Sequence, residues 1–125
     1  MHGARPPLAS DGNLMATSPD ITEIAPAALK VLLESAQPPL VLDVREAWER
    51  EAARLPGTVD IPMMEIPQRL AELPHDRDIV VMCHGGVRSL KVAHFLARNG
   101  FSRLANLSGG IHAWACEVDP GIGTY

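Results

Sequence analysis

A short segment enclosed by a cysteine and an arginine carries the clearest chemistry of the sequence: Cys83, His84, Gly85, Gly86, Val87 and Arg88. Two adjacent glycines permit backbone angles closed to other residues, so the segment can curl with its amide N–H groups pointing inward. Inward amides at the start of a helix favour an anion and keep a cysteine in its reactive thiolate form. The spacing therefore predicts that Cys83 is a nucleophile, with Arg88 as a planar cation suited to an oxyanion.

The elements that must position this segment alternate between strand and helix patterns. Short apolar runs predict strands at residues 21–24, 39–44, 58–61, 78–82 and 104–107. Helical spacing of apolar residues predicts helices at residues 26–34, 46–54, 65–73, 88–99 and 111–117. This order is typical of an α/β fold with a central, mainly parallel five-stranded sheet flanked by helices on both faces. Ligands of such sheets bind outside the carboxyl ends of the strands, where we expect both Cys83 and Asp43.

The length and composition indicate one globular domain. The chain has 125 residues, of which 46% are hydrophobic and 21% are charged, a balance that can support a core without disulfides or metals. Residues 1–18 are rich in Gly, Pro, Ala and Ser and show no periodicity, so we expect a flexible N-terminal leader there. The remaining residues, 19–125, are predicted to form the single domain.

The net charge and the cysteine content limit the classes of partner and compartment. A formal charge of −4 argues against nucleic acid or an anionic membrane surface as the partner. The two cysteines do not form a dense disulfide framework, and residues 1–18 lack the features of a secretory signal. No apolar run reaches the roughly 20 residues needed to span a bilayer. We therefore predict a cytoplasmic protein.

Three ordered motifs resemble those of the rhodanese-like domain family. The segment CHGGVR resembles the six-residue active-site loop of rhodaneses, which has cysteine first and arginine last. VLDVREAWERE followed by LPGTVDIP, and LSGGIHAW near the end, also match in order and spacing. The resemblance covers residues 21–118 and is to single-domain sulfurtransferases of the thiosulfate sulfurtransferase type.

The resemblance implies a two-step sulfur transfer. Cys83 would take the outer sulfur of thiosulfate or a related persulfide donor and become a persulfide itself. An acceptor would then remove this sulfur: cyanide in the test tube, or a thiol such as glutathione, thioredoxin or a sulfur-carrier protein. Residues 84–88 would cradle the anion and the persulfide, and no metal or organic cofactor is implied. The remaining histidines lack the spacing of metal ligands: His2, His75, His94 and His112.

Two other functions are compatible with the same motifs. Cysteine-dependent phosphatases and arsenate reductases of related fold place five residues between cysteine and arginine, and this chain has four. The shorter loop favours a single sulfur atom over a tetrahedral oxyanion. The other alternative is a non-catalytic carrier module that receives its persulfide sulfur from a partner protein.

Several residues in and near the loop have predicted roles, some of them with an alternative. Arg88 either contacts the substrate or pairs with a nearby carboxylate. Asp43 and Arg45 match the family's Asp-x-Arg, which implies that they brace the catalytic loop; the alternative is a helix N-cap at Asp43 beside a surface arginine. His84 is expected at the mouth of the pocket, where it would shape donor selectivity. Cys116 is either a resolving thiol or an incidental exposed thiol.

The two tryptophans stand at aromatic positions typical of the family. Trp48 lies in a predicted helix after the second strand, and Trp114 lies in the last predicted helix. Large aromatic side chains bury much apolar area, so both are expected in the core.

Overall fold

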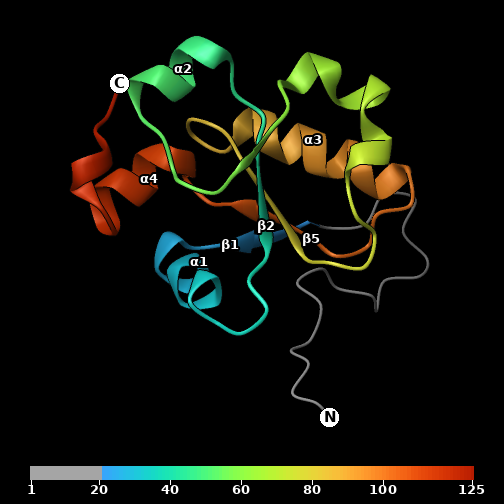
Figure 1. The fold of residues 1–125 in the computed structure, drawn as a ribbon, viewed down its shortest axis with the longest axis horizontal. Helices are drawn as coiled ribbons and strands as arrows, with labels where there is room; N and C mark the ends of the chain where they lie inside the picture. The colour runs from blue at the N-terminus through green and yellow to red at the C-terminus, as the bar shows by residue number, and fades with distance from the viewer. Residues whose placement is uncertain (1–20) are drawn as a thin grey trace.

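A computed structural model, which describes residues 21–125, contains one parallel sheet with the strand order β1-β5-β4-β2-β3 (Figure 1). The strands are β1 (Thr22–Ile24), β2 (Leu40–Asp43), β3 (Val59–Asp60), β4 (Ile79–Met82) and β5 (Leu104–Leu107). Every pair of neighbouring strands runs parallel, so the predicted α/β class and five-stranded sheet are confirmed. The predicted leader, residues 1–18, and the predicted domain start at residue 19 lie outside the described residues.

Helices cover both faces of the sheet. They are α1 (Pro26–Leu33), α2 (Ala47–Ala52), α3 (Val87–Arg98) and α4 (Gly110–Glu117), with 3-10 helices η1 (Met63–Gln68), η2 (Leu70–Glu72) and η3 (Pro120–Ile122). Figure 1 shows α1 and α4 on one side of the sheet and α3 on the other. Within residues 21–125, no helix is both long enough and apolar enough to cross a bilayer.

The central strand β4 divides the core into two layers because its side chains alternate between the two faces. Ile79 and Val81 pack in the layer beneath α3, whereas Val80 and Met82 pack in the layer beneath α1 and α4. All four are fully or almost fully buried, as a strand covered on both faces must be. The strand that precedes Cys83 is therefore fixed from both sides.

The predicted helix at residues 65–73 is wrong. The structure has two 3-10 helices there, η1 and η2, separated at Arg69. Pro67 lies inside η1; it lacks an N–H group and disfavours the α conformation at Ile66. The segment is therefore divided into short turns instead of one α-helix.

The two tryptophans have different environments. Trp114 is 7% exposed and packs in the layer beneath α4, so its predicted place in the core is confirmed. Trp48 is 65% exposed, so its predicted burial is wrong. The six-residue helix α2 buries the next residue, Glu49, in its place, because that carboxylate has partners inside the protein.

Candidate active site

Cys83 follows β4 directly and lies at the carboxyl edge of the sheet, as the sequence predicts. Asp43, the last residue of β2, is the register partner of Met82, so the ends of these neighbouring strands lie side by side. Cys83 is 1% exposed, and the chain then turns through residues 84–86 into α3. Gly86 has a φ of +105°, a left-handed conformation that glycine adopts without strain.

The sulfur of Cys83 accepts three hydrogen bonds from the turn and the first residues of α3. Its Sγ lies 3.1 Å from the Gly86 amide nitrogen, 3.4 Å from the Ser89 amide nitrogen and 3.2 Å from Ser89 Oγ. Donors arranged in this way stabilise negative charge on the sulfur. Sequence reasoning identified Gly86 but missed Ser89. The available signal was a small hydroxyl residue in the first turn of the helix that follows the cysteine.

The start of α4 binds the backbone of the loop. The amides of Ile111 and His112 donate to the carbonyl oxygens of Cys83 and His84, at 2.9 and 3.1 Å. A Cβ atom at Gly110 would overlap the carbonyl of His84 and lie 2.5 Å from the carbonyl oxygen of Cys83. The close approach of α4 therefore requires glycine at position 110. Because these loop carbonyls accept hydrogen bonds from α4 while the Cys83 sulfur accepts them from α3, both helices hold the loop.

Arg88 pairs with a carboxylate, one of its two predicted roles. Its Nη1 and Nη2 each lie 2.7 Å from an oxygen of Glu49, a residue of α2 whose side chain is 4% exposed. The Arg88 hydrogen bonds lower the pKa of Glu49 to about 2, although burial opposes this shift. The same hydrogen bonds raise the pKa of Arg88. Both groups are therefore ionised near neutral pH, and this ion pair joins α2 to the end of the loop.

A known family model matches most of the chain. The family model of the rhodanese-like domain matches residues 25–117 of this chain. The chain belongs to the rhodanese-like domain family. A protein named "Sulfurtransferase" from Allochromatium vinosum is 37% identical over 95 residues, which cover 76% of this chain and 89% of that protein.

Solved structures give the same result for this rhodanese-like domain. The crystal structure of a rhodanese-like domain protein from Staphylococcus aureus has a TM-score of 0.73 and 33% identity, and the match covers 84% of this chain and 99% of that one. The single-domain sulfurtransferase RDL2 of Saccharomyces cerevisiae has a TM-score of 0.69 and 25% identity, with 86% and 98% of the two chains covered.

Asp43 and Arg45 form a buried ion pair in this rhodanese-like domain. Arg45 Nε and Nη2 lie 3.0 and 2.8 Å from the Asp43 carboxylate, and neither side chain is exposed. Arg45 also donates to the carbonyls of Glu49 and Ala53 in and after α2. The alternative of a surface arginine beside an N-cap at Asp43 is wrong, because Arg45 is buried and the N-cap of α2 is Glu46.

Arg45 can be buried as a cation because hydrogen-bond partners stabilise its charge. Desolvation by itself would lower the pKa of Arg45, but hydrogen bonds with Asp43 and Tyr125 outweigh it and raise the pKa. The Tyr125 hydroxyl accepts from Arg45 at 3.0 Å and donates to Glu49 at 2.8 Å. The hydrogen bonds of Asp43 and Arg45 thus lead to α2, and they reach the loop through Glu49 and Arg88.

A row of aromatic and imidazole rings in this rhodanese-like domain includes His84 of the loop. The ring centre of Tyr125 lies 4.3 Å from that of His84 and 5.9 Å from that of Trp48. His84 also lies 5.7 Å from the ring of His112, whose Nε2 is 3.7 Å from the exposed Cys116 sulfur. His84 is half-buried in this row, and both cysteines are free thiols. The predicted effect of His84 on donor selectivity stays a prediction.

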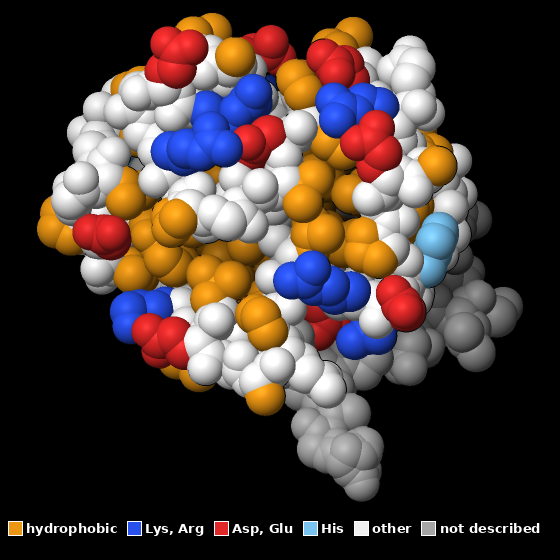
Figure 2. Space-filling view, in the orientation of Figure 1, with side chains coloured by type: hydrophobic (Ala, Val, Ile, Leu, Met, Phe, Trp, Pro, Cys, Tyr) orange, Lys and Arg blue, Asp and Glu red, His pale blue; other side chains and the backbone are white. Residues whose placement is uncertain are grey.

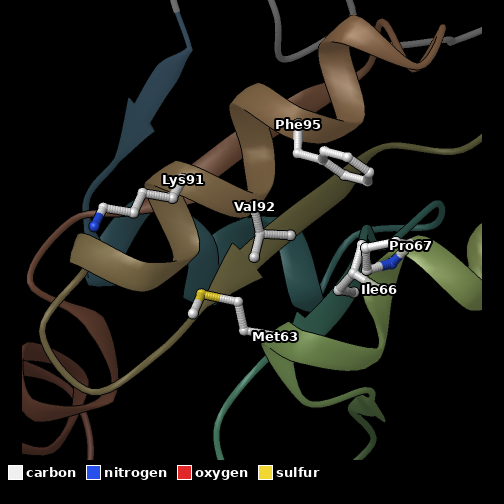
Figure 3. Close-up of a pocket in the computed structure, with 6 residues that line it drawn as sticks. All are labelled: Met63, Ile66, Pro67, Lys91, Val92 and Phe95. Carbon is white, nitrogen blue, oxygen red and sulfur yellow. The ribbon is translucent and has the colours of Figure 1, made fainter.

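An apolar hollow of about 170 Å³ lies between η1 and α3. Its lining consists of Met63, Ile66, Pro67, Lys91, Val92 and Phe95. Figure 3 shows the Lys91 ammonium group pointing away from Ile66 and Pro67, so the lining itself is apolar. Figure 2 shows apolar side chains exposed between basic and acidic ones on this face of the molecule. None of the residues 83–88 contributes to this lining.

Proposed function

We propose that this rhodanese-like domain is a sulfurtransferase that moves a sulfane sulfur through a persulfide on Cys83. The donor is thiosulfate or a related sulfane compound, and the acceptor is cyanide or a thiol, including a thiol of a protein such as thioredoxin or a sulfur carrier. The observation that carries the proposal is the set of three donors on the Cys83 sulfur, from the Gly86 amide and from the amide and hydroxyl of Ser89. They stabilise a sulfur anion before and after the transfer.

The transfer proceeds in two displacements. The Cys83 thiolate attacks the outer sulfur of thiosulfate; a sulfur–sulfur bond forms at Cys83, the bond to the sulfonate group breaks, and sulfite leaves with its electron pair. Cyanide or a thiolate then attacks the outer sulfur of the persulfide. Thiocyanate or a new persulfide leaves, and the Cys83 thiolate returns. Neither step needs a redox co-reactant, because the sulfur moves as a neutral atom between nucleophiles.

The remaining loop residues have supporting roles in this proposal. The glycines of residues 84–88 allow the turn that brings the Gly86 amide to the sulfur. Arg88, anchored by Glu49, fixes the end of the loop at the start of α3. Asp43 and Arg45 support the loop indirectly, since they position the helix that carries Glu49.

Steady-state turnover tests the proposal. Wild-type protein is expected to form thiocyanate from thiosulfate and cyanide with the parallel double-reciprocal lines of a two-displacement mechanism. Cys83→Ser is expected to form none, and Cys116→Ser is expected to match the wild type. Hydrolysis of an aryl phosphate by the wild type but not by Cys83→Ser, without thiocyanate formation, would instead support a phosphatase. Uptake of sulfur only from a persulfidated protein would support a carrier module.

A further inference from the structure

One polar side chain interrupts the buried apolar strand β5. Asn106 is 2% exposed and stands between Ala105 and Leu107, which are fully buried. Side chains alternate along a strand, so Asn106 points to the face on which Leu104 packs beneath α3. An asparagine in such a place costs stability unless its amide has hydrogen-bond partners. The partners of Asn106 therefore explain its place in the core.

The Asn106 amide binds the loop beside the nucleophile. Its Nδ2 donates to the carbonyl oxygen of Gly86 at 3.1 Å, and the Leu90 amide of α3 donates to the same oxygen at 3.3 Å. Gly86 is the residue whose amide nitrogen lies 3.1 Å from the Cys83 sulfur. Glycine adopts many backbone conformations, so Gly86 needs such partners to keep its N–H directed at the sulfur.

Glu23 of β1 fixes the direction of the Asn106 amide. The two residues are register partners on neighbouring strands, and Asn106 Nδ2 lies 3.2 and 3.1 Å from the two Glu23 carboxylate oxygens. The Glu23 carboxylate and the Gly86 carbonyl are both acceptors, so the amide must turn its nitrogen toward them. Asn106 Oδ1 has no hydrogen-bond partner among residues 21–125. The donor side of the amide thus makes the contacts that hold it.

We propose that Asn106 is a positioning residue for sulfur transfer, because its amide holds Gly86 in the conformation that directs the Gly86 N–H at the Cys83 sulfur. The inference rests on the proposed function, since it concerns how the same sulfur is stabilised as an anion. Asn106 acts through Gly86, and Glu23 assists by orienting the amide. When this contact is lost, the Gly86 donor turns away from the sulfur, and a smaller fraction of Cys83 is thiolate at neutral pH.

The test measures alkylation of Cys83 by iodoacetamide as a function of pH, in a Cys116→Ser background, because alkylation reports the thiolate without any sulfur donor. Asn106→Ala is expected to slow alkylation at neutral pH by about tenfold and to move the pH profile to higher pH. Asn99→Ala is the matched control. Its Nδ2 donates at 2.8 Å to the Phe95 carbonyl at the exposed end of α3, and the variant is expected to keep the rate and the profile. A purely structural role of Asn106 would lower the melting temperature without moving the profile.

A second pair of variants does not depend on the folding of Asn106→Ala, because Glu23 is exposed. Glu23→Gln and Glu23→Leu remove the same charge, but only Glu23→Gln keeps an oxygen that accepts from Asn106. Glu23→Leu is expected to be alkylated at Cys83 about threefold more slowly than Glu23→Gln. Equal profiles of Asn106→Ala and Asn99→Ala, or equal rates of the two Glu23 variants, would overturn the inference. A wild type that gains no sulfur from thiosulfate or glutathione persulfide would instead contradict the proposed function, and the alkylation result would still decide the role of Asn106.

Discussion

The Glu49 carboxylate and the Arg88 guanidinium meet across 39 residues of sequence, with two nitrogen–oxygen distances of 2.7 Å. Glu49 belongs to the six-residue helix α2, and Arg88, the last residue of the loop, lies in the first turn of α3. Two parallel hydrogen bonds between full charges give this contact a defined geometry as well as strength. The position of the loop end therefore depends on α2, and the position of α2 depends on the buried pair of Asp43 and Arg45.

The pKa of Glu49 predicts how stability changes in acid. Its hydrogen bonds with Arg88 lower the folded-state pKa to about 2, below the ordinary value of 4.5. The stabilisation is thus complete above pH 4.5 and is lost as the pH falls toward 2. Between pH 6 and pH 3 the loss amounts to about 2 kcal/mol of unfolding free energy. Urea unfolding at these two pH values is expected to show a drop that is smaller by about this amount in Glu49→Gln. Equal drops in the two proteins would show that the pair does not set the acid stability.

Two glycines near the loop are expected to respond differently to alanine. A Cβ at Gly110 would overlap the carbonyl of His84, and its φ of +63° already disfavours other residues, whereas a Cβ at Gly85 meets open space. Gly110→Ala is therefore expected to lower the free energy of unfolding by more than about 2 kcal/mol, and Gly85→Ala to change it by less than about 0.5 kcal/mol. Urea denaturation measures both. Similar stabilities of the two variants would mean that α4 does not lie this close to the loop.

The hydroxyl of Ser89 is expected to affect chemistry more than stability. It donates to the Cys83 sulfur at 3.2 Å, while two backbone amides keep donating when the hydroxyl is removed. Ser89→Ala is expected to slow sulfur loading of Cys83 by about tenfold, the usual effect of one hydrogen bond to a charged group. The melting temperature serves as the control and is expected to change little. A loading rate equal to that of the wild type would show that the Ser89 hydroxyl does not assist sulfur transfer.

Local patterns were sufficient to predict the part of the molecule that carries the nucleophile. The apolar run before Cys83 has no polar face, so it required a strand covered on both sides, and the two glycines required a turn after it. The alternation of strands and helices then led to the parallel sheet, and the family resemblance supplied the loop roles.

Contacts between distant elements were beyond the reach of the same patterns. The partner of Arg88 could not be chosen from the sequence, because several acidic residues were available and only the tertiary fold brings Glu49 to it. Trp48 was assigned to the core on residue type, but in a helix as short as α2 the buried position went to the charge-paired Glu49. Tyr125 gave no local signal, since its contacts with Arg45 and Glu49 span more than 70 residues.

The most direct test of the central claim is the mass of the intact protein after brief mixing with an excess of sulfane donor and then with cyanide. The wild type and Cys116→Ser are expected to gain the mass of one sulfur atom and to lose it when cyanide is added, whereas Cys83→Ser is expected to gain none. A sulfur atom on Cys83→Ser, or no gain by the wild type from either thiosulfate or glutathione persulfide, would contradict a persulfide on Cys83.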